Sequence, residues 1–336
     1  MSSTNTQIKL AARPTGMPGP ECWKTEEAEI PSPGEGEVLL QILQISLDPA
    51  MRGWMNEARS YVPPVRINQV MRALTLSRVV QSNSSDLKEG DLVTGTQGVQ
   101  QYAVAKPEDL TKIDANLAEP SRFLSVLGMT GMTAYFGLFD VGQPKPDDIV
   151  VVSGAAGAVG QIVGQLAKIH GCKTIGIAGG QEKCKFLTDE IGYDHAIDYK
   201  SQNVAKEIKR HAKKGLDVYF DNVGGEILEA ALFNLNRGAR IVICGAISQY
   251  NTTDVQGPRN YLSLLVNRAR MEGMVVFDYA DRFGMAVEKM AGWLKEGKLK
   301  SKEDIVKGEV TDFPDTFLKL FSGENQGKLI LQIADL

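Results

Sequence analysis

The stretch that most constrains the fold runs from Asp148 to Gly160 and reads DIVVVSGAAGAVG. Its β-branched run, Ile149 to Val152, is typical of a strand buried on both faces of a parallel sheet. A turn of small residues follows, and then a helical pattern that reaches His170, with Gly171 as the expected C-terminal cap. Such turns let the backbone approach a pyrophosphate, and the following helix N-terminus offers N–H groups. The stretch therefore indicates a dinucleotide site, although Ala155 stands where the G-x-G-x-x-G pattern has its first glycine.

Strand and helix patterns alternate after this turn. Further strands are predicted over 174–178, 195–198, 216–220, 239–244 and 273–277, and helices over 181–191, 204–211 and 226–235. This spacing predicts an α/β fold with a Rossmann-type, doubly wound parallel sheet. Ligands of such sheets bind outside the carboxyl ends of the strands, so we expect the site at the loops after Val152, Ala178, Phe220 and Cys244.

The chain before the glycine-rich turn has a different pattern. Strands predicted over 38–47, 73–80 and 91–94 are separated by turn residues, which favours a small, barrel-like β domain. The small and apolar residues of 122–139 predict a helix that leads toward the turn.

Length and charge narrow the function classes. The 336 residues suffice for two domains, and the formal net charge of -4 includes no basic block, which argues against nucleic-acid binding. No apolar run reaches the length of a membrane span, and the N-terminal stretch lacks the apolar segment of a secretory signal. We therefore expect a cytoplasmic enzyme.

The metal-ligating residue types are few and scattered. The four cysteines are Cys22, Cys172, Cys184 and Cys244, and the three histidines are His170, His195 and His211. No two cysteines have the close spacing of a structural zinc site, and the first 169 residues hold no histidine. The sequence predicts no metal site, which argues against a zinc-dependent alcohol dehydrogenase.

The end of the second predicted strand indicates which dinucleotide binds. Units that prefer NAD place an acidic residue there for the ribose 2′-hydroxyl, but this chain has Ala178, Gly179 and Gly180. Lys183 follows within one helical turn and adds a cation suited to a 2′-phosphate. The sequence therefore predicts NADPH (NADP) rather than NADH.

Seven stretches resemble one known family. They are LDPAMRGWM (47–55), SYVPPV (60–65), LGMTGMTAYFGL (127–138), AAGAVG (155–160), YFDNVGG (219–225), CGAISQYN (244–251) and GENQGK (323–328). The chain resembles the zinc-independent medium-chain dehydrogenase/reductases, in the prostaglandin reductase, alkenal double-bond reductase and curcumin reductase branch. The resemblance implies a GroES-like domain over 1–128, an NADPH-binding Rossmann domain over 129–300, a segment 301–336 that returns to the GroES-like domain, and a homodimer.

The same resemblance implies cofactor contacts. Contacts to the pyrophosphate are expected from Gly157, Ala158, Val159 and Gly160, and contacts to the 2′-phosphate from Lys183 and Tyr199. Contacts on the nicotinamide and ribose side are expected from Asn222, Cys244, Gly245, Ala246, Ile247, Ser248, Tyr250, Val275, Val276, Phe277 and Asn325.

Three departures from the family pattern lie on the expected substrate side. Ala50 stands where the family usually has a tyrosine, and Trp54 replaces an arginine. The stretch 73–76 reads ALTL where relatives often have several glycines. We expect Ala50 and Trp54 to bind substrate and to alter its permitted size and shape.

The reaction implied is reduction of a carbon–carbon double bond conjugated to a carbonyl, with hydride delivered from the nicotinamide C4 to the β-carbon. Negative charge then develops on the carbonyl oxygen, which needs a hydrogen-bond donor, and the α-carbon needs a proton. Tyr250 is the first candidate donor and Tyr61 the second, while a ribose hydroxyl or a water is an alternative. A packing role for Tyr250, an NADPH quinone reductase and a non-enzymatic NADPH-binding sensor stay open.

Overall fold

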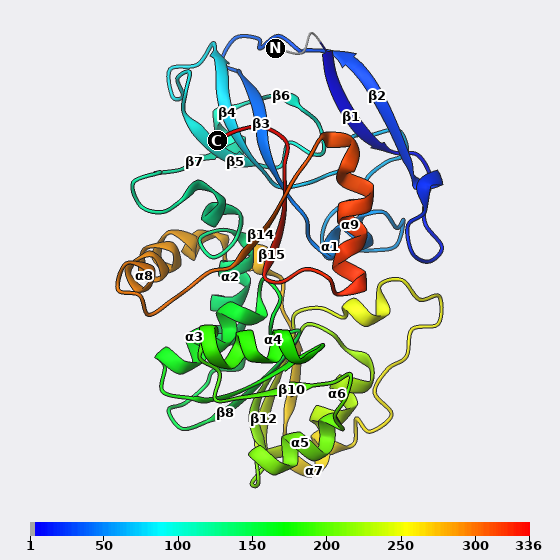
Figure 1. Ribbon diagram of the computed structural model, residues 1–336, viewed down its shortest axis with the longest axis vertical. Coiled ribbons are helices and arrows are strands. Elements are labelled where there is room, and N and C mark those ends of the chain that lie inside the picture. The colour runs from blue at the N-terminus through cyan, green and yellow to red at the C-terminus, as the bar shows by residue number, and fades with distance from the viewer. Residues whose placement is uncertain (1–3) are drawn as a thin grey trace. The chain divides into compact units, whose positions relative to one another are not determined.

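The computed structural model describes residues 4–336, and the first three residues of the N-terminal stretch lie outside that range. The chain forms two compact units (Figure 1). Unit 1 comprises the chain up to Leu124 together with Glu303–Leu336, and unit 2 comprises Ser125–Lys302.

Unit 2 is built on a six-stranded sheet in the order β10-β9-β8-β11-β12-β13, with every pairing parallel. The strands are β8 (Ile149–Ser153), β9 (Lys173–Ala178), β10 (His195–Asp198), β11 (Leu216–Asp221), β12 (Leu235–Ile243) and β13 (Arg270–Gly273). The order reverses between β8 and β11, so the doubly wound fold predicted from the sequence is confirmed.

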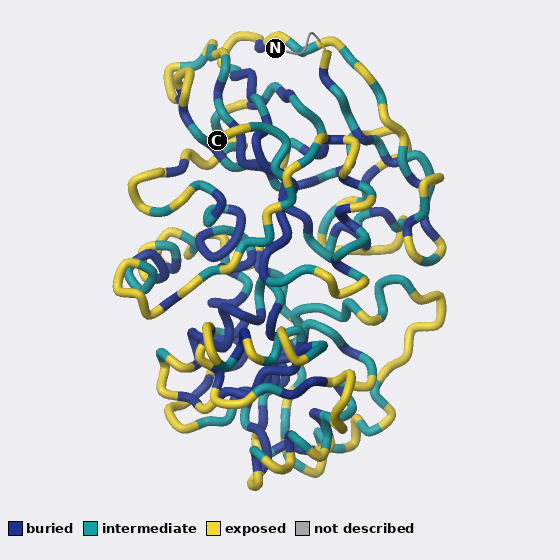
Figure 2. Tube along the Cα trace, viewed as in Figure 1, coloured by how far each residue is buried: buried dark blue, intermediate teal, exposed yellow. Residues whose placement is uncertain are grey.

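Helices connect and cover these strands. They are α2 (Met129–Phe136), α3 (Gly160–Ile169), α4 (Gln181–Lys185), α5 (Val204–His211), α6 (Gly225–Leu232), α7 (Ser263–Asn267) and α8 (Phe283–Lys295). Wider π-helical turns extend α2 over Gly137–Gly142 and α4 over Phe186–Ile191. Because helices lie against both faces, the central strands are buried: Val150, Val151 and Val152 have no exposed surface, and the strands are dark blue in Figure 2.

Two sequence-based element predictions are wrong. The strand expected over 273–277 ends at Gly273, because its partner β12 ends at Ile243 and offers no further ladder. A 3₁₀ helix, Val276–Arg282, follows instead. The helix expected over 122–139 begins only at Met129, where the chain folds so tightly that a Cβ on Gly131 would collide with the Val126 carbonyl.

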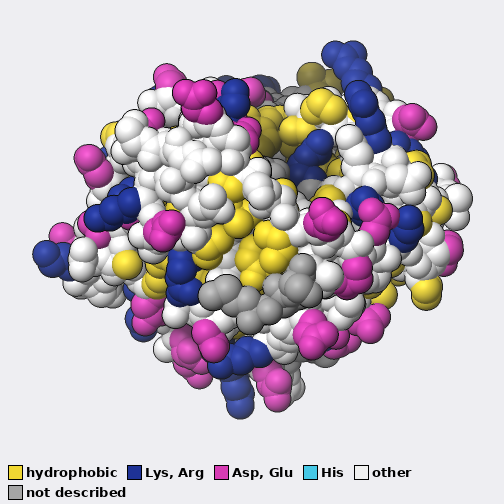
Figure 3. All heavy atoms as spheres, turned by 90° about the horizontal axis from the view of Figure 1, so that it is seen from above, with side chains coloured by type: hydrophobic (Ala, Val, Ile, Leu, Met, Phe, Trp, Pro, Cys, Tyr) yellow, Lys and Arg dark blue, Asp and Glu magenta, His cyan; other side chains and the backbone are white. Residues whose placement is uncertain are grey.

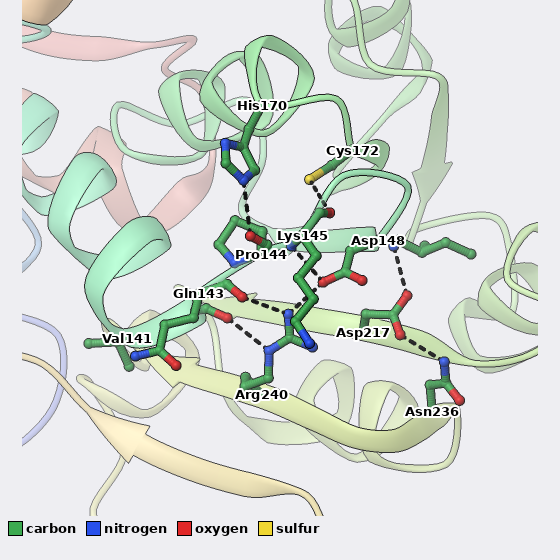
Figure 4. A network of polar contacts seen from close by, with 12 residues as sticks. Val141, Gln143, Pro144, Lys145, Asp148, His170, Cys172, Asp217, Asn236 and Arg240 are labelled. Carbon is green, nitrogen blue, oxygen red and sulfur yellow. Dashed lines mark hydrogen bonds and ion pairs between the residues drawn. The ribbon is translucent and has the colours of Figure 1, made fainter.

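A polar network joins the amino ends of three central strands (Figure 4). The Arg240 side chain donates to the carbonyl oxygens of Gly142 and Gln143, at 2.9 Å each, and pairs with Asp148 just before β8. Asp217 accepts from the Ile149 N–H at 2.9 Å, which links β11 to β8. This network fixes the sheet at the edge opposite the glycine-rich turn.

Unit 1 contains a seven-stranded sheet and a two-stranded antiparallel sheet. Its strands are β1 (Thr4–Leu10), β2 (Trp23–Glu29), β3 (Val38–Ser46), β4 (Thr75–Ser82), β5 (Leu92–Gly95), β6 (Tyr102–Ala105), β7 (Leu110–Lys112), β14 (Glu303–Lys307) and β15 (Lys328–Gln332). Its helices are α1 (Ala50–Trp54) and α9 (Phe313–Ser322). The larger sheet has the order β14-β15-β3-β4-β5-β7, and β6 also pairs with β3.

The C-terminal segment completes the unit 1 sheet. Strand β15 pairs antiparallel with β3, with Ile330 opposite Ser46. Helix α9 packs Phe313 and Phe317 edge-on against Trp23, with ring centroids 5.4 and 6.2 Å apart. The Phe313 and Phe317 rings are fully buried, so this C-terminal helix is part of the core of unit 1.

Charges of both signs are interspersed over the face drawn in Figure 3, without a continuous block of one sign. No helix within residues 4–336 has the length and apolar character needed to cross a membrane.

Lys328 anchors the returning segment inside unit 1. Its ammonium is buried, with the residue 1% exposed, and it donates to the Leu47 carbonyl at 2.8 Å and to the Asp48 carboxylate at 2.6 Å. Burial lowers the pKa of Lys328, and the Asp48 charge opposes that shift. The pair thus holds β15 at the end of β3, just before α1.

Replacing Lys328 with Met should lower the free energy of unfolding by about 2 kcal/mol, because the charge-assisted bond to Asp48 is lost, while Asp48 is 26% exposed and still accepts from the Ser46 hydroxyl. The change is measurable by urea unfolding. Lys307→Met, at an exposed position on β14, is the matched control and should change stability little. Equal unfolding midpoints for the two variants would show that Lys328 does not anchor the segment.

Candidate functional site

The turn after β8 carries the geometry of an anion site. Gly154 adopts a left-handed conformation with φ of 57°, and the Gly157 N–H donates back to its carbonyl at 3.0 Å. Helix α3 starts at Gly160, and no side chain caps its N-terminus. The N–H groups of Gln161 and Ile162 donate to the Gly157 and Val159 carbonyls, at 3.1 Å each, which leaves the backbone of residues 158–160 at the helix start to meet a phosphate.

Gly160 is required by close packing. A Cβ at this position would collide with the Gly154 carbonyl oxygen and with Ala155, so any larger residue would push the helix away from the turn. This is the role of the last glycine in the fingerprint, which permits close approach of helix and strand.

The structure also explains Ala155 at the first glycine position. The Ala155 side chain is fully buried and points toward Gly176 on β9, where an added Cβ would lie only 3.0 Å from the Ala155 methyl. The missing glycine of the fingerprint is therefore accommodated by a glycine on the neighbouring strand. The left-handed turn residue is Gly154, one position earlier.

The loop after β9 offers no carboxylate for a ribose hydroxyl. Asp198 ends β10, the neighbouring strand, and its side chain accepts from the Gly180 N–H at 2.7 Å, the Lys200 N–H at 3.0 Å and the Ser201 hydroxyl at 2.8 Å. Burial opposes ionisation, but these donors hold the pKa of Asp198 below its usual range. Asp198 therefore fixes the loops after β9 and β10 to each other.

Tyr199 and Lys183 lie on these joined loops. The Tyr199 N–H donates to the Ala178 carbonyl at 3.1 Å, and its ring packs so closely on Gly179 that an added Cβ would lie 2.8 Å from the phenolic oxygen. Lys183 lies on α4, which starts at Gln181. The structure thus places both residues predicted for a 2′-phosphate beside the acid-free end of β9.

The Asp221 side chain links the carboxyl ends of β8 and β11. One carboxylate oxygen, Oδ1, accepts four hydrogen bonds of 2.8 to 3.0 Å. The donors are the Ser153 and Tyr219 hydroxyls and the Val223 and Gly224 N–H groups. The residue is 1% exposed, and within residues 4–336 its Oδ2 has no hydrogen-bond partner. Burial raises the pKa of Asp221 above its usual range, although the four donors oppose the shift.

Asn222 extends this network to the loop after β12. Its side-chain amide donates to the Ser153 carbonyl at 2.7 Å, and its own carbonyl accepts from the Ile247 N–H at 3.2 Å. The Asp221 carbonyl accepts from the N–H groups of Cys244 and Gly245, at 2.9 and 3.1 Å. The loops after β8, β11 and β12 are therefore one hydrogen-bonded assembly.

Two reactive residue types stand on the β12 loop. Burial, assisted by the Asp221 charge, raises the pKa of the Cys244 thiol to about 12, so it stays protonated and is a poor nucleophile. Tyr250 follows a 3₁₀ turn, Ile247–Gln249, and its hydroxyl accepts from the Ala246 N–H at 3.2 Å. A phenol can both accept and donate a hydrogen bond.

The other nicotinamide-side residues of unit 2 lie after β13. Met274 still donates to the Ile243 carbonyl at 3.2 Å, and Val275 is extended. Val276 is buried and Phe277 is 45% exposed at the start of the 3₁₀ helix, so they stand on a helical turn and not on the predicted strand.

Unit 1 holds the remaining predicted residues. Ala50 and Trp54 are the first and last residues of α1, and Tyr61 is 55% exposed in the segment that follows. Asn325 lies before β15, with its side-chain amide donating to the Gly327 carbonyl at 3.2 Å. The substrate-side predictions and Asn325 are thus in one unit, and the other cofactor residues are in the other unit.

Sequence reasoning missed Asp221 and Ser153 as organising residues. A signal was present, because Asp221 is an acid directly after the apolar run of β11 and Ser153 ends the valine run of β8. Tyr193 was missed as well: it is 3% exposed and donates to the Gly160 carbonyl at 2.7 Å, which holds the start of α3. No local pattern marks that contact.

Within the described residues, no group of three or more His, Cys, Asp or Glu side chains could hold a metal ion.

A doubly wound sheet with a glycine-rich turn after its first strand, joined to a β-rich unit, defines a dinucleotide-dependent oxidoreductase of two domains. Two family models match the chain, the N-terminal domain of oxidoreductase over residues 6–113 and zinc-binding dehydrogenase over residues 158–292.

Relatives of known identity narrow the class. The chain is 42% identical to the NADPH-dependent curcumin reductase of Escherichia coli (strain K12), over 98% of this chain and 97% of the relative. It is 37% identical to the 2-alkenal reductase (NADP(+)-dependent) of Nicotiana tabacum, over 98% of each. The structure of CurA in complex with NADPH from Vibrio vulnificus matches with a TM-score of 0.93 and 42% identity, over 98% of this chain and 100% of that one. The chain belongs to the medium-chain dehydrogenase/reductase family, in the zinc-independent branch with these reductases.

Asp221 should make stability depend on pH. Its raised pKa means that the folded protein keeps the proton that the unfolded chain loses near pH 4, so its contribution to stability falls as the pH rises from about 4 through the folded-state pKa. Asp221→Asn removes this titration. The unfolding free energy of the wild type relative to this variant should fall with rising pH, by about 1.4 kcal/mol for each unit of pKa shift.

Urea unfolding of both proteins across this pH range measures the difference. Asp281→Asn, at an exposed position in the same unit, is the control and should show no such trend. A difference between wild type and Asp221→Asn that does not vary with pH would contradict the assignment.

Proposed function

We propose that this protein is an NADPH-dependent reductase of the carbon–carbon double bond of α,β-unsaturated ketones and aldehydes. The observation that carries the proposal is the similarity, over nearly the whole chain, to a curcumin reductase and a 2-alkenal reductase. Curcumin and 2-alkenals share one chemical feature, a carbon–carbon double bond conjugated to a carbonyl group. The geometry of the loops at the carboxyl edge of the sheet supports the same conclusion.

The residues fit the proposed cofactor. The uncapped start of α3 and the close contact at Gly160 suit a pyrophosphate, held by the backbone of residues 157–160. Three donors engage the Asp198 carboxylate, so it is already occupied as an acceptor, while Lys183 supplies a cation and Tyr199 a hydroxyl for a 2′-phosphate. The nicotinamide and ribose side is assigned to Asn222, Cys244, Gly245, Ala246, Ile247, Ser248, Tyr250, Val275, Val276, Phe277 and Asn325.

NADPH supplies the hydride for the β-carbon when it is bound. The residues of the chain then have to stabilise the negative charge on the carbonyl oxygen. The Tyr250 hydroxyl is the proposed donor to that oxygen, and the Asp221 network holds the loop on which it stands. Tyr61 is the second candidate for this donor, and a ribose hydroxyl or a water is the alternative to both tyrosines.

The expected activity is oxidation of NADPH in the presence of a simple enone, followed by absorbance, at a rate far above that with NADH. Lys183→Ala should raise the KM for NADPH about tenfold and leave the KM for NADH nearly unchanged, because one charged contact to the 2′-phosphate is lost. Lys185→Ala, two residues further along α4, is the matched control.

A protein that reduces quinones but no enone would be a quinone reductase instead. One that binds NADPH but turns over no enone, enal or quinone would be a binding protein. Equal use of NADPH and NADH would contradict the cofactor assignment. The first two outcomes would contradict the proposed reaction, and the third would contradict the proposed cofactor.

Tyr250→Phe should lower kcat about 100-fold, with a small change in the KM for NADPH, because the donor for the developing charge is lost. Tyr61→Phe should have a much smaller effect. Steady-state kinetics with one enone measure both. An unchanged kcat for Tyr250→Phe would leave the tyrosine with a packing role and assign the donor to a ribose hydroxyl or a water.

We further propose a homodimer in the cytoplasm, the state that the family resemblance implies. Light scattering after size exclusion should give twice the mass of one chain.

A further inference from the structure

Unit 1 contains a hollow of about 340 Å³ that none of the residues predicted for the site lines directly. Its lining residues come from the segment after α1 and from the turn after β5, and they are Val65, Gln69, Val70, Arg72, Thr96, Gln97 and Gly98. Six of these seven residues are uncharged, so Arg72 is the single formal charge of the lining.

Arg72 is held in place without a counter-charge. One guanidinium nitrogen donates to the Pro63 carbonyl at 2.9 Å, and the guanidinium carbon lies 5.5 Å from the centre of the Trp54 ring. Within residues 4–336, no carboxylate lies within 4.0 Å of the Arg72 guanidinium. Because a guanidinium has five N–H donors in a rigid fork, the bond to Pro63 leaves donors for a ligand.

Trp54 connects the hollow to α1. Its carbonyl accepts from the N–H of Val65, a lining residue, at 2.9 Å. The indole Nε1 is buried, and within the described part of the chain it has no hydrogen-bond acceptor. A buried N–H donor without an acceptor costs free energy. The Trp54 Nε1 donor and the Arg72 guanidinium, which has no counter-charge, therefore indicate a binding site whose ligand supplies acceptor atoms.

The position of the hollow agrees with the sequence departures. Ala50 and Trp54 belong to α1, and Arg72 directly precedes the stretch 73–76. Two of the three departures from the family pattern are therefore adjacent to Arg72, the stretch 73–76 in sequence and Trp54 through its ring.

We propose that this hollow binds a carboxylate at the end of the substrate remote from the double bond, with Arg72 as the residue that determines this specificity. The inference rests on the proposed enone reductase function and adds the substrate class, enones that carry a carboxylate. A planar guanidinium fork pairs with a carboxylate through two parallel hydrogen bonds, and Gln97 and Thr96 add neutral polar groups to the lining.

The test compares benzylideneacetone with its para-carboxylate, under NADPH, in four proteins: the wild type, Arg72→Gln, Arg72→Lys and Arg66→Gln. The wild type should have the higher kcat/KM for the carboxylate. In Arg72→Gln the ratio of the two kcat/KM values should fall about 10- to 100-fold, the loss expected for hydrogen bonds to a charged group. Arg72→Lys should retain part of the preference, and rising salt should weaken it.

Arg66→Gln is the matched control, because it removes the same charge from an exposed position six residues away and should keep the wild-type ratio. Calorimetric titration of the saturated carboxylate ketone gives a second readout that needs no turnover, and its affinity should fall in Arg72→Gln alone. An unchanged ratio and affinity in Arg72→Gln would overturn the proposal. If the wild type reduces neither compound, the proposed function fails, and the titration still decides whether Arg72 binds a carboxylate.

Discussion

The carboxylate of Asp221 is the interaction on which the candidate site depends. A single oxygen accepts from a hydroxyl at the end of β8, from a tyrosine of β11 and from two N–H groups of the following turn. The backbone carbonyl of the same residue receives the first two N–H groups after β12. Strand ends in a parallel sheet carry polar groups that no neighbouring strand satisfies, and a buried acceptor at this point satisfies several of them at once.

The same principle operates at two other places in the molecule. Arg240 and Asp148 join strand ends at the opposite edge of the unit 2 sheet, and Lys328 with Asp48 joins β15 to the end of β3 in unit 1. In each case the ion pair joins residues that are far apart in the sequence. Loops that start from fixed points hold functional groups with greater precision than loops without such anchors.

Unit 2 holds most of the residues proposed to bind the cofactor, and unit 1 holds those proposed to bind the substrate. Unit 2 presents the uncapped helix, the acid-free end of β9 and the loop that carries Tyr250. Unit 1 presents α1, which contains Ala50 and Trp54, and the hollow beside Arg72. Because cofactor chemistry is common to the family and end-group recognition is not, variation confined to unit 1 can change the substrate while the reaction stays the same.

The sequence by itself determined the alternation of strands and helices, the doubly wound class and the glycine-rich turn, because these follow from local apolar periodicity and local backbone freedom. Only the tertiary structure decided that Gly176 accommodates Ala155, that Asp198 is engaged by the Gly180 loop, and that a strand at 273–277 has no partner beyond Ile243. It also decided the contact of Arg72 with Trp54, eighteen positions apart in the chain. Such contacts join residues from different elements, and their energy depends on side-chain distance and burial, which no local pattern encodes.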